Sequence, residues 1–424
     1  MSSTKPTAII FGGLNTYSRA LAAHLVPLEG EPLVSHVRIV DKYSVKPPTT
    51  YIGAEFPKIL DKPEVDYHQA NVTVASTVAS MFDPPEGVAG YDYVFDFTGE
   101  IRPDRLEKAG SPLSPFPPPP IHIQWTFNVA RLIATEAAKR NVKAYVRLQL
   151  PFYETSSKTP ATEKDDVKPE DSIGTWWHET LRMLGAMENL NVVALRIGHA
   201  YGPYVNFGII PTLITVASVY GYLKKPMKSL WGPGKHGNNT VHTDDVAGAM
   251  WACAEWMASL GRKAADEKAG EDIPFHNDKA KVAEVEGMIP PGQKVKLPLF
   301  NLVDDSNSTF ASAGSTVTEL FGTTFEFFNF FENTILKMAD VVEDINEHHV
   351  GGWTEMVQKS NPPVPNTPLS AYMDAYQLEK HVCAFSNQKI KEVVGYRLKK
   401  PTFDHEGIRE VVDKWKEEGS WPIL

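Results

Sequence analysis

The sequence contains very little cysteine. Its two cysteines, Cys253 and Cys383, stand far apart among 424 residues and lack the short paired spacings of zinc ligands. So few cysteines support neither a disulfide framework nor a cysteine-based zinc site. We therefore expect no disulfide and no metal centre in this protein.

Long hydrophobic runs and an excess of positive charge are also missing. No apolar run reaches the ~20 residues that a membrane-spanning helix needs. The formal net charge is −10, with the acidic residues spread along the chain, which disfavours nucleic acid or an anionic membrane as the main partner. Residues 1–6 lead directly into an apolar run and leave no room for a secretory signal. These absences predict a soluble, cytoplasmic protein with no nucleic-acid or membrane partner.

What the chain does contain is a regular alternation of strand and helix patterns. Strand-like runs occur at residues 8–11, 36–41, 65–72, 91–99, 142–150 and 192–196. Helical patterns lie between them, for example at residues 73–82. This alternation is typical of an α/β fold with a doubly wound parallel sheet, in which ligands bind outside the carboxyl ends of the strands.

The turn after the first strand has the layout of a dinucleotide-binding fingerprint. Turn glycines allow a pyrophosphate to approach the backbone at the N-terminus of the following helix. Gly12 takes the first glycine position and Gly13 follows it, but Asn15 and Ser18 replace the second and third glycines. Because asparagine tolerates a left-handed backbone and serine is small, the turn is still compatible with a nucleotide site.

A carboxylate closes the second strand. Asp41 stands where an acidic residue accepts hydrogen bonds from the adenosine ribose hydroxyls. This favours NAD, although Lys42 directly after it leaves NADP open. The fourth strand ends in Thr98 and Gly99, small residues beside which a cofactor has room to lie.

The fifth strand carries two polar side chains near its end. Arg147 and Gln149 lie on the same side of an otherwise apolar strand. Two interpretations remain open for this pair: it is functional, or Arg147 is satisfied by a neighbouring carboxylate.

Several motifs later in the chain resemble one enzyme family. Residues 195–203, LRIGHAYGP, resemble the L-R-x-x-x-x-Y-G-P signature of the extended short-chain dehydrogenase/reductases, the NAD-dependent epimerase/dehydratase family. Residues 241–247, VHTDDVA, resemble its V-H-V-D-D-V-A motif, and the turn at 231–234 is similar to its Y-G-D-G. Residues 300–303 look like its Y-N-V strand, and residues 386–422 are similar to its L-G-Y…W terminus. The resemblance covers nearly the whole chain.

The resemblance implies a division of the chain and a set of cofactor contacts. A Rossmann domain would comprise residues 1–202, 236–260 and 297–305, and a smaller α/β substrate lobe residues 203–235, 261–296 and 306–424. The residues implied to hold NAD(P) are Gly12, Gly13, Asn15, Tyr17 and Ser18 at the pyrophosphate, Asp41 at the ribose, Asn71 and Val72 at the adenine, Phe97, Thr98 and Gly99 along the cofactor, and Ile197 and Gly198 near the nicotinamide.

The catalytic residues implied by the resemblance are missing. In the family, a tyrosine with a lysine four residues later moves the hydroxyl proton during hydride transfer, and a serine or threonine after the fifth strand steadies the oxygen. Here the serine position falls on Gln149 or Leu150, and no Tyr-x-x-x-Lys lies in the helix expected after residue 171. Such spacings at Tyr220, Tyr376 and Tyr396 all follow the sixth strand, and we interpret them as chance matches.

Other side chains are therefore candidates for the acid/base role. His178 lies in the helix that would carry the missing pair, and an imidazole transfers protons near neutral pH. Tyr153, just after the fifth strand, is a second candidate acid, and Gln149 is the candidate for steadying the oxygen.

Two segments depart from the family pattern. The proline-rich residues 103–120 are expected to form a stiff surface loop. Residues 322–368 enlarge the smaller lobe as a lid or a partner surface, with a helical first half expected within 325–346. We also expect His348 and His349 at the surface, and a structural role for His242 before Asp244 and Asp245.

Two functions of different classes follow. The first is an NAD-dependent oxidoreductase of the epimerase/dehydratase type, acting on a small hydroxylated substrate such as a nucleotide sugar with relocated acid/base residues. The second is a catalytically inactive dinucleotide-binding protein that regulates or scaffolds a partner. A homodimer through the helices expected at 123–139 and 174–188 is compatible with the resemblance, and core packing explains their apolar stripes equally well.

Overall fold

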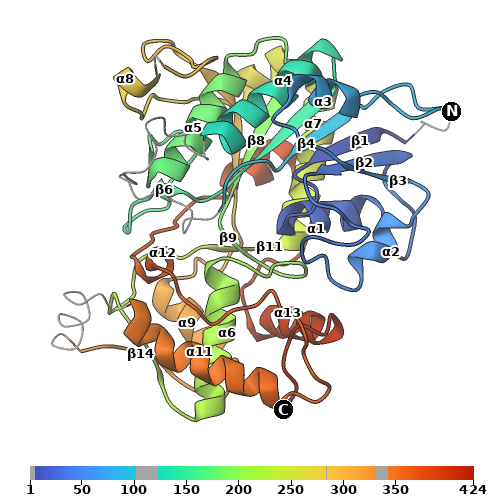
Figure 1. The fold of residues 1–424 in the computed structure, drawn as a ribbon. Helices are drawn as coiled ribbons and strands as arrows, with labels where there is room; N and C mark the ends of the chain where they lie inside the picture. Colours follow the sequence, from blue (N-terminus) through green and yellow to red (C-terminus); the bar gives the residue numbers. More distant parts are fainter. Residues whose placement is uncertain (1–4, 102–122, 283, 330–341) are drawn as a thin grey trace, which may run out of the picture.

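The computed structural model describes residues 5–101, 123–282, 284–329 and 342–424. The expected proline-rich loop at 103–120 therefore lies outside the described residues. Figure 1 shows a sheet flanked by helices, with a smaller, mainly helical lobe below it. No described helix combines the length and apolar character needed to cross a bilayer.

The large sheet is almost entirely parallel. Its eight strands follow the order β12-β13-β8-β5-β4-β1-β2-β3, and β12 alone runs antiparallel to its neighbour β13 among these described strands. The strands are β1 (Thr7–Phe11), β2 (His36–Asp41), β3 (Val65–Gln69), β4 (Tyr93–Asp96), β5 (Ala144–Gln149), β8 (Val192–Ile197), β12 (Gly270–Asp272) and β13 (Lys296–Leu302). The predicted doubly wound parallel sheet is confirmed, although β3, β4 and β5 are shorter than expected.

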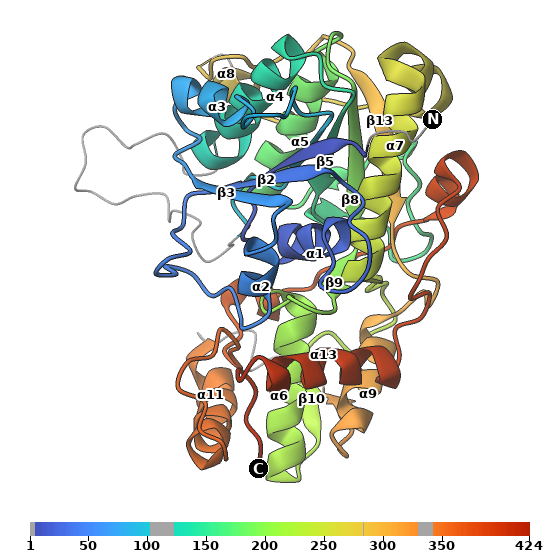
Figure 2. The ribbon, with the colours of Figure 1, turned by 90° about the vertical axis from the view of Figure 1, so that its right-hand side faces the viewer.

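Helices cover both faces of this sheet. The helices α1 (Thr16–Leu25) and α7 (Thr243–Ala269) lie on one face, and α3 (Ala75–Met81), α4 (Val129–Lys139) and α5 (Ser172–Gly185) on the other (Figures 1 and 2). Neighbouring strand residues alternate between the two cores: Ile10 packs with Leu21 and Met250, whereas Ile9 packs with Val78 and Ile133. Burial on both faces explains why the strands appear as unbroken apolar runs in the sequence.

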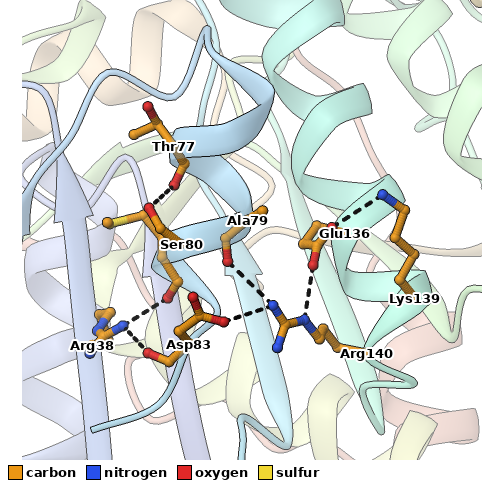
Figure 3. A network of polar contacts seen from close by, with 9 residues as sticks. Arg38, Thr77, Ala79, Ser80, Asp83, Glu136, Lys139 and Arg140 are labelled. Carbon is orange, nitrogen blue, oxygen red and sulfur yellow. Dashed lines mark hydrogen bonds and ion pairs between the residues drawn. The ribbon is translucent and has the colours of Figure 1, made fainter.

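A polar network ties α3 to the sheet and to α4 (Figure 3). Arg38 of β2 donates to the carbonyls of Met81 and Asp83, just where α3 ends, and pairs with Asp66 of β3 at 2.8 Å. Arg140, after α4, donates to the Asp83 carboxylate and to Glu136. Because Arg38 is buried and Arg140 is exposed, we expect the Arg38 contacts to contribute most of the stabilisation.

The smaller lobe is built from helices around its own core. It contains α6 (Ile209–Leu223), α9 (Phe310–Leu320), α11 (Val342–Lys359), α12 (Ala375–Leu378), α13 (His405–Glu417) and the paired strands β10 (Met227–Ser229) and β14 (Phe325–Phe327). Ile214, Val317, Trp353 and Trp415 are buried together there. The shorter elements of the chain are α2 (Phe56–Leu60), η2 (Ile123–Asn128), β6 (Tyr153–Glu154), β7 (Lys168–Pro169), β9 (His199–Tyr201), β11 (Thr240–His242), α8 (Lys279–Val282) and η3 (Ile390–Val394).

Two expectations for this lobe are wrong. Residues 325–327 form strand β14, paired with β10, where a helix was expected, and residues 330–341 of that segment lie outside the described part. His349 is only 3% exposed, because α11 packs on α6 and turns His349 towards Tyr220, whose hydroxyl lies 3.2 Å from the His349 Nε2. His348 is exposed, as expected.

Candidate functional site

A cleft of about 580 Å³ lies at the carboxyl ends of the strands. One wall is formed by the turn after β1, the loop after β2 and residues 97–101 after β4, and the opposite wall by the start of α6 and residues 368–377 of the smaller lobe. A second cavity of about 80 Å³ lies beside the ends of β5 and β8. The two cavities adjoin, since both are lined by Ile101, Phe207, Asp374 and Gln377.

The turn after β1 is held by its own side chains. Gly12 has a φ of +71°, and a Cβ there would lie 3.0 Å from the carbonyl carbon of Phe97, so glycine is needed for both conformation and space. Asn15 caps α1: its Oδ1 accepts from the Ser18 N–H at 2.9 Å, and its Nδ2 donates to the Phe97 carbonyl. The Ser18 Oγ donates to the Gly12 carbonyl at 2.7 Å. The two residues that replace glycines therefore stiffen the turn.

Asp41 lines the cleft and is tied to the same turn. Its Oδ2 accepts from the Leu14 N–H at 2.9 Å, and its Oδ1 from the Lys42 N–H at 2.7 Å. Burial raises the pKa of Asp41 above its ordinary value, while these backbone donors oppose the rise. Oδ1 also accepts from the Tyr43 N–H at 3.4 Å, whereas Oδ2 accepts a single hydrogen bond, so Oδ2 keeps acceptor capacity for a ligand hydroxyl.

Most of the residues predicted to bind the cofactor surround these cavities. The large cleft is lined by Gly12, Asn15, Asp41, Val72, Phe97, Thr98 and Gly99, and the smaller cavity by Tyr17 and Gly198. Four others lie outside the lining: Gly13 packs on β2, Ser18 and Ile197 are buried, and the Asn71 side chain accepts from Thr73.

Arg147 pairs with a buried carboxylate, although its Nε and Nη2 have no hydrogen-bond partner among the described residues. Its Nη1 lies 2.7 Å from the Oδ2 of Asp96, and both side chains are completely buried. Asp96 also accepts from the Tyr145 hydroxyl at 2.5 Å and from the N–H and hydroxyl of Thr98. Of the two interpretations left open by the sequence, the structure favours the neighbouring carboxylate, and the cluster holds Thr98 at the floor of the cleft.

The three candidate catalytic side chains form one hydrogen-bonded chain. Gln149 Nε2 donates to the Tyr153 hydroxyl at 3.1 Å, and that hydroxyl lies 3.3 Å from His178 Nδ1. His178 Nε2 lies 2.7 Å from the carbonyl of Pro274, so Nε2 carries the proton and Nδ1 accepts. All three residues are buried, and none of them lines either cavity.

Burial fixes the protonation states within this chain. It lowers the pKa of His178 to about 4 and raises the pKa of Tyr153 to about 12. At neutral pH the imidazole and the phenol are therefore both uncharged. Their catalytic role stays a prediction.

The low pKa of His178 predicts a pH dependence of stability. Between the unfolded value of ~6.5 and the folded value of about 4, the unfolded state binds more protons, so stability is lost as the pH falls through that window. From pH 7 to pH 5 this group should cost about 2 kcal/mol. In His178→Gln, which keeps a donor for the Pro274 carbonyl, urea unfolding at both pH values should show a correspondingly smaller loss. His348→Gln, at an exposed position, is the control, and an unchanged pH response in His178→Gln would contradict the assignment.

Trp177 directly follows Thr175 and Trp176, the two positions where the helix would carry its lysine. Its indole is 1% exposed and donates to the Glu100 carbonyl at 2.8 Å. A Cβ on Gly99 would lie 2.4 Å from Trp177 Cζ2, and the Arg147 guanidinium lies 4.4 Å from the centre of the indole ring. Asp171, near the expected tyrosine position, is the N-cap of α5. A helix cap thus lies near the expected tyrosine position, and a buried indole lies directly after the expected lysine positions.

The remaining Tyr-x-x-x-Lys spacings fall into different surroundings. The Tyr396 hydroxyl donates to Asp245, and Tyr220 contacts His349. The Tyr376 side chain lines the smaller cavity, while its hydroxyl donates to Glu170 at 3.3 Å. None of these contacts pairs a tyrosine with the lysine four residues later.

His242 has the structural role expected of it. Its Nδ1 accepts from the Asp244 N–H and caps α7. Asp244 and Glu410 lie close enough to share an ion with this imidazole. However, the accepted backbone hydrogen bond leaves the proton on Nε2, and Lys400 already pairs with Glu410 at 2.7 Å. This donor set does not fit a metal ion.

The structure adds cleft residues that the sequence did not single out. Trp125 lies in the cleft with Lys42, whose Nζ is 4.4 Å from the centre of a Trp125 ring. Residues 368–377 come from a segment remote in sequence and close the opposite wall. Arg19 also lines the cleft, and its place four residues after Asn15 was the available signal, because residues so spaced share a helix face.

Comparisons with known proteins agree with this architecture. No family model matches the chain, and no curated protein matches it in sequence. Solved structures do match over almost the full length. A UDP-glucose 4-epimerase from Thermotoga maritima, solved with UDP-glucose, is 12% identical with a TM-score of 0.58, covering 97% of this chain and 99% of that one. The chain has the epimerase/dehydratase fold.

Two further structures share this epimerase/dehydratase fold. The Bordetella bronchiseptica enzyme WbmG, solved with NAD and UDP, is 13% identical with a TM-score of 0.59, covering 98% of this chain and 96% of that one. The epimerase Mth375 from Methanothermobacter thermautotrophicus is 12% identical with a TM-score of 0.59, covering 98% and 93%. At such identities the likeness concerns the fold, and it confirms the fold expected from the sequence motifs.

Proposed function

We propose that this protein binds NAD in the cleft and transfers hydride between NAD and a small hydroxylated substrate. The proposal rests on the position of the cleft. It extends from Asp41 past the glycine turn and the end of β4 to the wall formed by the smaller lobe. One molecule bound along the strand ends would thus face a second one held by the lobe. WbmG, with the same fold, was solved with NAD and UDP, which supports a nucleotide-sugar substrate.

The residues present fit such a cofactor. Gly12 of the turn lines the cleft, Asp41 retains acceptor capacity there, and Trp125 offers an aromatic face in the same cleft. When bound, NAD would supply the hydride-accepting nicotinamide. The chain itself would bind and orient the two molecules, and residues 368–377 would exclude water from the side of the lobe.

A second candidate function is nucleotide binding without turnover. The packing of Trp177 against Gly99 and the burial of Gln149, Tyr153 and His178 away from both cavities favour it. In this case the bound nucleotide would stabilise a surface that a partner recognises.

Mass spectrometry of molecules released from the protein, purified without added nucleotide and then denatured, tests the binding step. We expect NAD, with a nucleotide sugar beside it if the substrate is also retained. Calorimetric titration of NAD, NADH and NADPH then checks affinity, which should fall about tenfold or more in Asp41→Ala through loss of the ribose acceptor. Absence of released nucleotide together with absence of binding heat would refute the proposal.

Turnover distinguishes the two functions. Absorbance of reduced nicotinamide, or interconversion of UDP-sugars in the wild-type protein, would support the oxidoreductase. With activity in hand, His178→Gln and Tyr153→Phe test the predicted proton carriers, and full activity in both variants would remove them. Binding of NAD without any turnover would leave the second function.

A further inference from the structure

Arg19 is a buried arginine in the wall of the cleft. It lies in α1, is 2% exposed, and borders the same cleft as Asn15 and Thr16 at the start of that helix. Within the described part of the chain its guanidinium donates one hydrogen bond, from Nη2 to the carbonyl of Tyr204 at 3.1 Å. Its Nε is buried without a partner. An arginine has five N–H donors, so most of its hydrogen-bonding capacity is not used by the chain.

No carboxylate of the described residues forms an ion pair with Arg19. Tyr204, Tyr51 and Glu418 are close enough to raise the pKa of Arg19, yet the Glu418 carboxylate already accepts from the N–H groups of Ala54 and Glu55. Glu55 is paired with Lys414. Burial outweighs these groups and lowers the pKa of Arg19 to about 10, so the guanidinium is still charged at neutral pH. A buried charge without a counterion is unfavourable, and an anionic ligand in the cleft would remove that cost.

The turn beside Arg19 has lost part of its own anion-binding capacity. In a glycine-rich turn, the first N–H groups of the helix face a phosphate. Here the Ser18 N–H is already bonded to Asn15 Oδ1, and the Ser18 hydroxyl fills the space towards Gly12. A ligand phosphate would therefore need a donor from elsewhere, and Arg19 lies one helical turn beyond Asn15 on the same face.

We propose that Arg19 binds the diphosphate of the ligand in this cleft. The inference rests on the proposed nucleotide-binding function and deepens it, by assigning to a side chain the role that turn glycines have in the standard fingerprint. A diphosphate of this kind belongs either to the dinucleotide or to a nucleotide-sugar substrate. In both cases the guanidinium would pair with phosphate oxygens through charge-assisted hydrogen bonds.

Calorimetric titration of the full chain with NAD, ADP, UDP and adenosine tests the proposal. In Arg19→Met, which keeps the length of the side chain but removes its charge, the affinity for the diphosphate ligand should fall by about 10- to 100-fold. Affinity for adenosine, which has no phosphate, should stay within about twofold. Arg19→Lys should recover part of the loss, because it restores the charge but not the fork of donors. Lys158→Met, at an exposed lysine outside the lining of both cavities, is the control for a general loss of positive charge.

The outcomes separate this inference from the proposed function. Loss of ADP and NAD binding places the dinucleotide at Arg19, and loss of UDP binding alone places the substrate there; both support the diphosphate role. Unchanged affinities in Arg19→Met, or an equal loss for adenosine, would overturn it and leave Arg19 a purely structural residue. If the wild-type protein binds no nucleotide, the proposed function fails. Titration with inorganic pyrophosphate then decides the inference. Binding by the wild-type protein that is lost in Arg19→Met would support the role of Arg19, and no binding by the wild-type protein would overturn it.

Discussion

Replacing Arg147 with methionine is expected to lower the free energy of unfolding by about 3–5 kcal/mol. The methionine fills much of the same volume, but it leaves the Asp96 carboxylate buried without its cation. Urea unfolding followed by circular dichroism measures the difference. The variant should shift the midpoint of the transition without changing the dependence of the unfolding free energy on urea concentration. Because Asp96 orients Thr98, the variant should also bind nucleotide more weakly.

A matched control exists at the other end of the same two strands. Lys143 precedes β5 and pairs with Asp92, before β4, at 2.8 Å, but the lysine is 63% exposed. Lys143→Met should therefore change stability by no more than about 1 kcal/mol. The double variant Asp96→Asn/Arg147→Met should lose less than the sum of the two single variants, since no lone charge remains. A loss below about 1 kcal/mol in Arg147→Met would show that the pair contributes no more than a surface pair.

Gly99→Ala is expected to lower the free energy of unfolding by about 2–4 kcal/mol. The added methyl group would meet the buried Trp177 indole at 2.4 Å, and the φ of +142° is unfavourable for any residue with a Cβ. Trp177 has little freedom to yield, because its N–H is bonded to the Glu100 carbonyl and Arg147 lies over its ring. Thermal and urea unfolding measure the loss.

Gly30→Ala is the control that separates the backbone cost of a positive φ from the steric overlap with Trp177. Gly30 has a φ of +100° with nothing within 4 Å of its Cβ position, so only the backbone cost of about 1 kcal/mol applies. Combining Gly99→Ala with Trp177→Leu should cost less than the sum of the two changes, since the smaller side chain makes room for the methyl group. Equal losses in Gly99→Ala and Gly30→Ala would mean that Trp177 does not restrict the end of β4.

The order of elements followed from local patterns. Apolar runs at 8–11, 36–41 and 192–196 match β1, β2 and β8 within one residue at each end, because these strands are buried on both faces. The smaller lobe was harder to predict. Residues 325–327 pair with β10, almost a hundred positions earlier in the chain, and the local apolar pattern resembles that of a helix.

The sequence by itself determined the individual strands of the sheet, the glycine turn and the place of Asp41 at the end of β2, because each depends on residues close together in the chain. Only the tertiary structure decided the partners of the polar side chains. Arg147 meets Asp96 from the adjacent strand, and Tyr153 meets His178 behind the wall of the cleft. Arg19 faces the cleft without a carboxylate because the acids around it are already bonded. Such pairings depend on how strands and helices remote in sequence pack together, and no spacing along the chain specifies them.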